Sequence, residues 1–533
     1  MPSITGHVSQ ENDDALVANS RTSPQPAPEA GTADAHQVVA RIGKNAIFLS
    51  VSFLSQIASQ VLILSIIGRL AGVEKAGIWT YVIAFIDPFQ VIMDLGTTRL
   101  LVPEIARRRE ETDLLLGNAL TLGVLVGTPV LATLAIVANL DILHHSETTI
   151  LELYLGGLAV LLFNLALSIR SALRAFNRFD LEAINSVLAA VVLVVGSFGV
   201  LFLQAPFISL FAVYALTYLI ALLNGWRLYN RHLGRIRFQY DPAVLRQILG
   251  KSWVFMFVIL LFRAYMRIDI LILRYFCGTV AVGYYGLVTA LFYRFDIVTR
   301  LLTTSILPSM SRSYVAQRGQ IGRYLNLALK VQILAALPIT VVGFILARPI
   351  IFLLYGSGYE PSVVIFQFLM TVLFLRLINR TFTVTLTAMD LQHRTLVALA
   401  LSVIFNITVN LFLIPRFEAL GATLTAMASE VVLCVLAYLS LTATARRSIR
   451  WETLARPLPS ILILTPPLYV MRDWPLLFSL PVSLVIYGLA LFLVRALSVT
   501  EVQALTNLME SINVLPVPLR RRLAALMLAR AHD

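Results

Sequence analysis

The sequence is poor in charged residues and in cysteine. Only 13% of its 533 residues are charged, against about 25% in soluble domains, which excludes an ordinary soluble protein. Its two cysteines, Cys277 and Cys434, lie far apart, so we expect free thiols and no disulfide scaffold. We find no His/Cys metal spacing, no Gly-rich phosphate loop and no nucleophile elbow. We therefore predict no metal, no cofactor and no enzymatic activity.

Apolar residues dominate instead, at 58% of the chain, with a mean hydropathy of +0.82. A membrane-spanning helix needs ~20 mostly apolar residues. The segments that meet this requirement are 45–68, 78–103, 115–139, 150–172, 181–203, 206–229, 252–276, 282–308, 327–355, 361–388, 393–414, 419–443, 456–471 and 475–496. We predict an all-α integral membrane protein with about 14 transmembrane helices.

The net charge of +13 comes almost entirely from arginine, and it is distributed unevenly between the predicted loops. Basic loops alternate with loops that have few basic residues. The basic loops are 107–111, 170–178, 227–237, 312–323, 391–394 and 446–451. Such loops face the cytoplasm in membrane proteins. We predict a multi-pass protein of the cell (inner or plasma) membrane with both termini in the cytoplasm, and we attribute the basic charge to this orientation and not to nucleic acid.

The chain contains an internal repeat with an offset of 206 residues. Gly72 and Gly77 correspond to Gly278 and Gly283, and Thr97–Thr98 corresponds to Thr303–Thr304. Because six spans separate the copies, they share one membrane orientation, as in transporters that rock two bundles around a central site. We predict two pseudo-symmetric six-helix lobes plus two extra C-terminal helices. The expected domains are a disordered cytoplasmic tail (1–40), the N-lobe with helices 1–6 (41–232), the C-lobe with helices 7–12 (233–445), helices 13–14 (446–498) and a cytoplasmic amphipathic tail (499–533).

Two stretches resemble a known family. "RIDILILRYFCGTVAVGYYGLVTAL" (267–291) with "SILPSMSR" (305–312), and the segment 388–432 with its "LIPRF" exit, are similar to polysaccharide flippases of the MOP exporter superfamily. The resemblance implies alternating access and transfer of an isoprenoid-diphosphate-linked oligosaccharide from the cytoplasmic to the outer leaflet, for cell-surface polysaccharide synthesis. It implies membrane lipids and this substrate as partners, with polysaccharide-assembly proteins as candidates.

Two branches of that superfamily offer alternatives. The lipid II flippases have an adjacent Arg–Asp pair in the first helix, where this chain has Ile63 and Leu64. This difference counts against lipid II as the substrate. The multidrug MATE branch uses acidic cavity residues for cations, and Asp87 and Asp94 keep a cation-coupled drug antiporter open as the alternative function.

Several arginines lie inside predicted spans, where a charge needs a partner or a water-filled cavity. Arg263 and Arg267 share one helix face, as do Arg376 and Arg380, and Arg294 lies near mid-depth. Arginine remains ionised and its fork matches phosphate oxygens. We predict that these five residues bind the diphosphate, with ion pairing between helices as the alternative.

Four further charges are candidates for gating or ion coupling: Asp87, Asp94, Asp296 and Arg300. The repeat offset places Asp94 opposite Arg300, so we hypothesise a pair that forms across the cavity in one state and separates in the other. The alternative role for Asp87 and Asp94 is a site for a coupling ion, H⁺ or Na⁺.

Overall fold

The computed structural model describes residues 32–140, 146–316 and 321–496, without the side chains of 32–42 and of a few residues in the helix that follows Pro242, among them 296–306. The described residues form helices and contain no β-strand. The main helices are α2 (Thr32–Leu70), α3 (Gly72–Asp94), α4 (Thr97–Arg107), α5 (Thr112–Ala138), α6 (Glu147–Ala175), α7 (Phe179–Phe202), α8 (Ser209–His232), α9 (Pro242–Ala316), α10 (Ile321–Ile345), α11 (Ala347–Tyr355), α12 (Glu360–Ala388), α13 (Gln392–Ser440), α16 (Ser460–Val470) and α17 (Leu476–Leu493). Two short helices, α14 (Ala443–Arg447) and α15 (Trp451–Ala455), join α13 to α16.

Twelve helices in the described ranges are long and apolar enough to cross a membrane. The predicted helical fold class is therefore confirmed, but the predicted count of fourteen is not. The long helices α9 and α13 each contain one break, at Gly278 (φ 81°) and at Glu418 (φ 50°). The predicted spans 252–276 and 282–308 lie on either side of the first break. The spans 393–414 and 419–443 flank the second in the same way.

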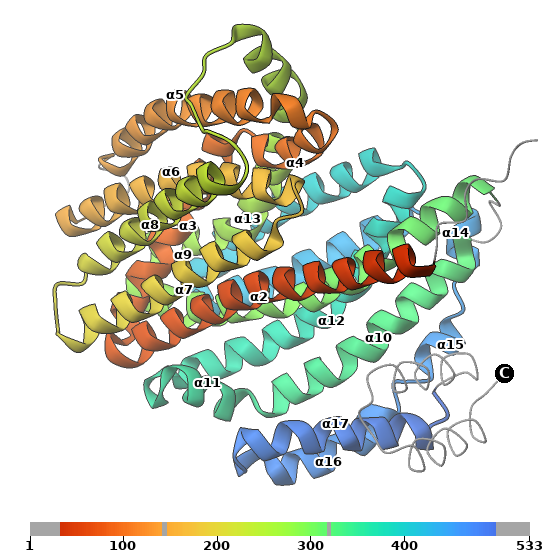
Figure 1. Ribbon diagram of the computed structural model, residues 1–533. Coiled ribbons are helices and arrows are strands. Elements are labelled where there is room, and N and C mark those ends of the chain that lie inside the picture. The colour runs from red at the N-terminus through yellow and green to blue at the C-terminus, as the bar shows by residue number, and fades with distance from the viewer. Residues whose placement is uncertain (1–31, 141–145, 317–320, 497–533) are drawn as a thin grey trace, which may run out of the picture.

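The helices pack into two groups and a small appendage (Figure 1). In the first half of the chain, α2 packs on α7, α6 packs on α8, and α3 and α5 pack on α6. In the second half, α9, α10, α12 and α13 pack on one another. Helices α16 and α17 lie side by side against α10, at one edge of the molecule. We call the first two groups the N-lobe and the C-lobe; the predicted domain limits themselves are not tested by this packing.

The two lobes meet most closely at the end of the bundle that carries Gly72, Gly278 and Gly356, here called the Gly72 end. A methyl group on Gly77 would overlap the carbonyl oxygen of Thr279, and one on Gly283 would overlap that of Val73. Glycine is the residue that lets two backbones approach this closely in a membrane protein. The contact is reciprocal, so each copy of the repeat supplies one glycine to it.

The repeat is also visible in the backbone itself. Gly72 and Gly278 have φ angles of 83° and 81°, in the left-handed region that favours glycine. Gly72 is the first residue of α3, and Gly278 lies at the break where the second half of α9 begins. Two positions that are 206 residues apart, the offset of the sequence repeat, thus have nearly the same backbone φ angle.

The buried core follows the same division. One large cluster at the Gly72 end includes residues from both lobes, such as Val82, Ile86, Val282 and Phe366. Away from it, the N-lobe and the C-lobe have separate clusters, around Leu116 and Leu325 respectively. The lobes therefore share their large apolar core at the Gly72 end. A second, small cluster joins Leu122 of α5 to Leu245 and Ile248 near the start of α9.

Two predicted terminal tails fall mostly outside the described residues. Helix α2 begins at Thr32, inside the segment predicted as a tail up to residue 40. Residues 1–31 and the amphipathic tail predicted for 499–533 lie outside the described ranges. The link between the lobes is described: Asn118 of α5 accepts a hydrogen bond from the amide of Asp241 at 2.7 Å, so residues just after the predicted boundary at 232 contact the N-lobe.

Candidate functional site

The first half of α9 carries two of the predicted arginines on one face. Arg263 and Arg267 are one turn apart, and both point to Asp87 of α3. Arg263 Nη1 lies 3.0 Å from each oxygen of the Asp87 carboxylate, and Arg267 Nε lies 3.2 Å from Oδ2. Asp87 is buried, and a buried charge needs a partner of opposite sign. Two guanidinium groups from the other lobe neutralise it.

These three residues line a pocket of about 330 Å³ between the N-lobe helices and α9. Arg294 of α9 lines the same pocket, and its buried Nε has no hydrogen-bond partner among the described residues. An unsatisfied buried donor on a charged group is uncommon in folded proteins. The pocket thus brings together three of the five arginines predicted to bind phosphate.

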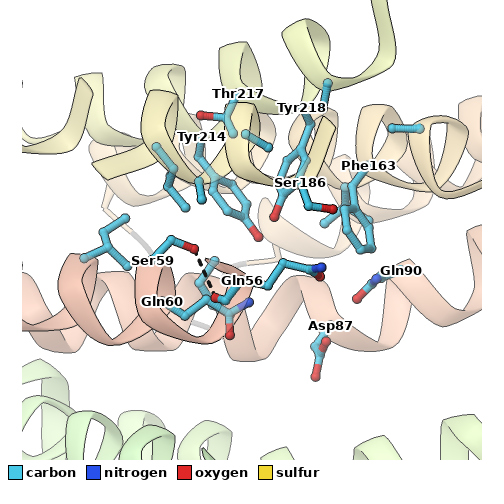
Figure 2. Close-up of a pocket in the computed structure, with 18 of the residues that line it drawn as sticks. Gln56, Ser59, Gln60, Asp87, Gln90, Phe163, Ser186, Tyr214, Thr217 and Tyr218 are labelled. Carbon is cyan, nitrogen blue, oxygen red and sulfur yellow. Dashed lines mark hydrogen bonds between the residues drawn. The ribbon is translucent and has the colours of Figure 1, made fainter. Parts of the chain in front are cut away.

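The remaining wall of the pocket is polar and aromatic. Figure 2 shows Tyr214 and Tyr218 projecting toward Gln56 and Gln90 from the opposite side of the pocket. The rings of Tyr214 and Tyr218 pack edge to face, with centroids 5.0 Å apart. The pocket is therefore cationic on its α9 side, and neutral with aromatic rings on its α8 side.

Arg376, also predicted as a phosphate ligand, lies in a different environment. Its Nε and Nη2 lie 3.3 and 3.2 Å from Oε2 of buried Glu430, whose other oxygen accepts a hydrogen bond from Asn379 at 2.9 Å. The guanidinium also lies over the ring of Phe292, 4.9 Å from its centroid. This is the arrangement expected of ion pairing between helices. Arg380 follows one turn later on α12 and does not line the pocket.

The predicted gating residues are only partly visible. Asp94 lies at the end of α3 and accepts hydrogen bonds from the hydroxyl of Thr98, at 3.0 Å, and from its amide, at 3.3 Å. It therefore caps the turn into α4 in this conformation. The side chains of Asp296 and Arg300 lie outside the described residues. The hypothesis that Asp94 pairs with Arg300 remains a prediction.

A buried ion cluster in the N-lobe was missed from the sequence. Glu182 of α7 accepts hydrogen bonds from Arg170, at 3.2 Å, and from Arg174, at 2.9 and 2.5 Å. Arg170 also lines the pocket. The available signal was the one-turn spacing of Arg170 and Arg174 in the sequence, but they were counted as parts of a basic loop.

The polar residues of α2 were also missed. Gln56, Ser59 and Gln60 line the pocket and follow the helical spacing i, i+3, i+4 inside an otherwise apolar span. This spacing is a signal that the sequence does contain. In the described ranges, no group of three or more His, Cys, Asp or Glu side chains is arranged to hold a metal ion.

Comparison with known proteins identifies the family. The model of the family described as "Polysaccharide biosynthesis protein" matches residues 42–314, just over half of the chain. The chain belongs to this family. The matched region contains the whole N-lobe and the part of α9 that supplies Arg263, Arg267 and Arg294, so every element of the pocket comes from the family region.

Single relatives resemble the chain more distantly. The probable flippase AglR of Haloferax volcanii is 28% identical over 178 residues, which cover 33% of this chain and 37% of AglR. The chain thus matches little more than a third of the length of this curated relative.

Solved structures give the fold. The lipid II flippase MurJ, in an inward closed conformation, has a TM-score of 0.66 at 14% identity, covering 84% of this chain and 98% of MurJ. The MATE transporter VcmN of Vibrio cholerae has a TM-score of 0.53 at 15% identity, covering 79% and 98%. At these identities the likeness shows a shared fold. The protein is a multi-pass membrane protein that shares its fold with MurJ and VcmN.

Proposed function

We propose that the protein moves an isoprenoid-diphosphate-linked oligosaccharide from the cytoplasmic to the outer leaflet of the cell membrane, for cell-surface polysaccharide synthesis. The observation that carries the proposal is the meeting of Arg263, Arg267 and Arg294 in one pocket between the lobes. Three positive charges face one carboxylate there, that of Asp87, which leaves an excess of two. A diphosphate diester carries about two negative charges, and arginine binds phosphate oxygens through paired hydrogen bonds.

The family and its relatives support the same function. The family is described by polysaccharide biosynthesis, and AglR and MurJ are both named as flippases. Moving a lipid-linked substrate between leaflets makes and breaks no covalent bond, so we propose a transporter that is not an enzyme. Membrane lipids surround it, and polysaccharide-assembly proteins are its candidate partners.

The packing of the lobes supports alternating access. The large shared core closes the Gly72 end, while at the other end the main clusters of the two lobes are separate and a small cluster links α5 to the start of α9. The loops at that other end, such as 107–111 and 446–451, are the basic ones, which favours a cytoplasmic location for them and for both termini. The conformation described here is then closed toward the outside, and Asp87 holds two of the substrate-binding arginines.

A cation-coupled drug antiporter of the MATE type is the second candidate. Its specific support is Asp87, a buried carboxylate in the pocket, and the likeness of fold to MATE transporters. In this conformation, however, Arg263 and Arg267 occupy that carboxylate, so it offers no open cation site. A role for Asp87 or Asp94 in binding a coupling ion, H⁺ or Na⁺, is part of either proposal.

The experiment measures phosphate binding and export in the same variants. Inorganic pyrophosphate should raise the melting temperature of the purified protein, and Arg263→Gln, Arg267→Gln and Arg294→Gln should each weaken that effect and reduce glycan export in cells. Arg348→Gln is the control, because the Arg348 side chain is 65% exposed and pairs with Glu360 outside the pocket.

Arginine-to-lysine variants add a further distinction, since lysine keeps the charge but loses the fork. We expect intermediate effects from them. The proposal is wrong if the three glutamine variants export glycan normally while substitutions of Asp87 or Asp94 alter drug resistance.

A further inference from the structure

The part of the pocket inside the N-lobe is lined by residues other than the three arginines proposed to bind the diphosphate. We call it the N-lobe chamber and define it by six residues from the four helices α2, α3, α7 and α8: Gln56, Gln60, Gln90, Asn185, Tyr214 and Tyr218. Arg263, Arg267 and Arg294 lie on its α9 side. A ligand held by those arginines would have the chamber directly beside it.

The chamber presents amides whose hydrogen-bonding capacity is not used. The side-chain amides of Gln60 and Gln90 form no hydrogen bond with any described residue. The side-chain amide of Gln56 donates to the backbone carbonyl oxygen of Ser52 at 2.9 Å, which leaves the side-chain oxygen of Gln56, Oε1, as an acceptor. Unpaired amides at membrane depth are costly, so they need water or a ligand that offers both donors and acceptors.

Aromatic rings form the opposite wall. Tyr218 packs edge to face against Phe163, with centroids 4.9 Å apart, and Tyr214 packs in the same way against Trp79, at 5.5 Å. Figure 2 shows the two tyrosines on the side of the chamber opposite Gln56 and Gln60. Rings held rigidly by neighbouring rings provide flat apolar surfaces with polar hydroxyls at their edges.

The charges of the chamber disfavour two other classes of ligand. Asp87 is the single carboxylate among the described lining residues, and two arginines pair with it, so the chamber does not offer the carboxylates that a cation requires. Arg170 also lines the pocket, and it donates to the buried carboxylate of Glu182 at 3.2 Å, so a second phosphate would have to compete with that carboxylate. The remaining chemistry suits a neutral ligand that is rich in hydroxyl groups.

We infer that the N-lobe chamber binds the sugar rings next to the diphosphate, while Arg263, Arg267 and Arg294 bind the diphosphate itself. This inference rests on the proposed function and adds a sugar subsite to it. The amides exchange hydrogen bonds with the sugar hydroxyls, and the tyrosine rings pack on the sugar faces. The whole pocket, arginine side and chamber together, has a volume of about 330 Å³, at the small end of the range for ligand pockets, ~300–1,000 Å³, so it admits the first sugars and not a long chain.

The test fills the chamber without touching the arginines. Ala190→Trp places an indole in the chamber, whereas Val191→Trp, at the next position of α7, projects away from it, because Val191 is 52% exposed. We expect Ala190→Trp to reduce glycan export about tenfold or more and to leave the affinity for inorganic pyrophosphate within about twofold of the wild-type value. Val191→Trp should change neither quantity.

A second variant removes a hydrogen-bonding group without adding bulk. Gln60→Leu should also reduce export and retain pyrophosphate binding, which keeps the test decisive if Ala190→Trp does not fold. Normal export by folded Ala190→Trp and Gln60→Leu protein would overturn the sugar subsite and leave the proposed function standing. Failure of the wild-type protein to bind pyrophosphate or to export glycan would instead overturn the proposed function.

Discussion

Glu182 is the fully buried charge whose ion pairs we expect to contribute most to the stability of the fold. Its side chain is 0% exposed and is held by Arg170, Arg174 and the hydroxyl of Ser52. Removing one partner of a buried ion pair costs about 3–5 kcal/mol, because the remaining charges are left uncompensated. Glu182→Gln should therefore lower the free energy of unfolding by about that amount, as measured by thermal unfolding in detergent.

The control lies two residues earlier in the chain. Asp180 pairs with Arg178, but both side chains are about one-third exposed, and such pairs contribute ~1 kcal/mol or less. Asp180→Asn should consequently have a small effect on the same melting curve. Equal losses of stability in the two variants would show that burial does not determine how much these ion pairs stabilise the protein.

The sequence identified charges that matter but not their partners. Helical spacing correctly placed Arg263 and Arg267 on one face, yet their partner Asp87 lies 176 and 180 residues away. Which face of a helix meets which neighbour depends on helix rotation and on lobe packing, and neither is encoded in local spacing. For the same reason Arg376 was grouped with the pocket arginines, although the structure places it against Glu430.

At the scale of the element, the glycines of α3 and α9 determine how closely the lobes pack. Gly77→Ala would add a methyl group that overlaps the backbone carbonyl of Thr279, which cannot move aside as a flexible side chain would. Overpacking of this kind costs ~1–3 kcal/mol. We expect Gly77→Ala and Gly283→Ala to lower both thermal stability and export.

Gly199 on α7 is the matched control, because a methyl group there would meet nothing within 4 Å. Gly199→Ala should leave export unchanged, and since alanine favours the helix by up to about 1 kcal/mol, stability should be equal or slightly higher. Wild-type stability and export in Gly77→Ala would contradict a close contact between α3 and α9.

Most elements could be predicted because apolar length is a strong local signal. The positions of Gly278 and Glu418 explain the difference in count: α9 and α13 each consist of two helices that meet at a sharp break, and each pair counts as a single candidate span. The repeated glycines were also visible in the sequence. Their role as contacts between lobes was not, because that contact requires both copies of the repeat in three dimensions.

For the whole molecule, the orientation in the membrane is a prediction that the two ends of α7 test directly. Asn177 precedes the helix and Gln204 follows it, and both are exposed. In a background with Cys277→Ser and Cys434→Ser, a membrane-impermeant thiol reagent should label Gln204→Cys in intact cells. Asn177→Cys should be labelled after the cells are permeabilised. The reverse pattern would place the basic loops outside.

The central claim is that the arginines between the lobes carry the diphosphate of a lipid-linked oligosaccharide across the membrane. Its most direct measurement is flipping in proteoliposomes, with a fluorescent isoprenoid-diphosphate oligosaccharide and a reagent that reports the outer leaflet. The wild-type protein and Arg348→Gln should move the lipid at the same rate, whereas the triple variant Arg263→Gln, Arg267→Gln and Arg294→Gln should be inactive although folded. Flipping by the triple variant at the wild-type rate would contradict the account.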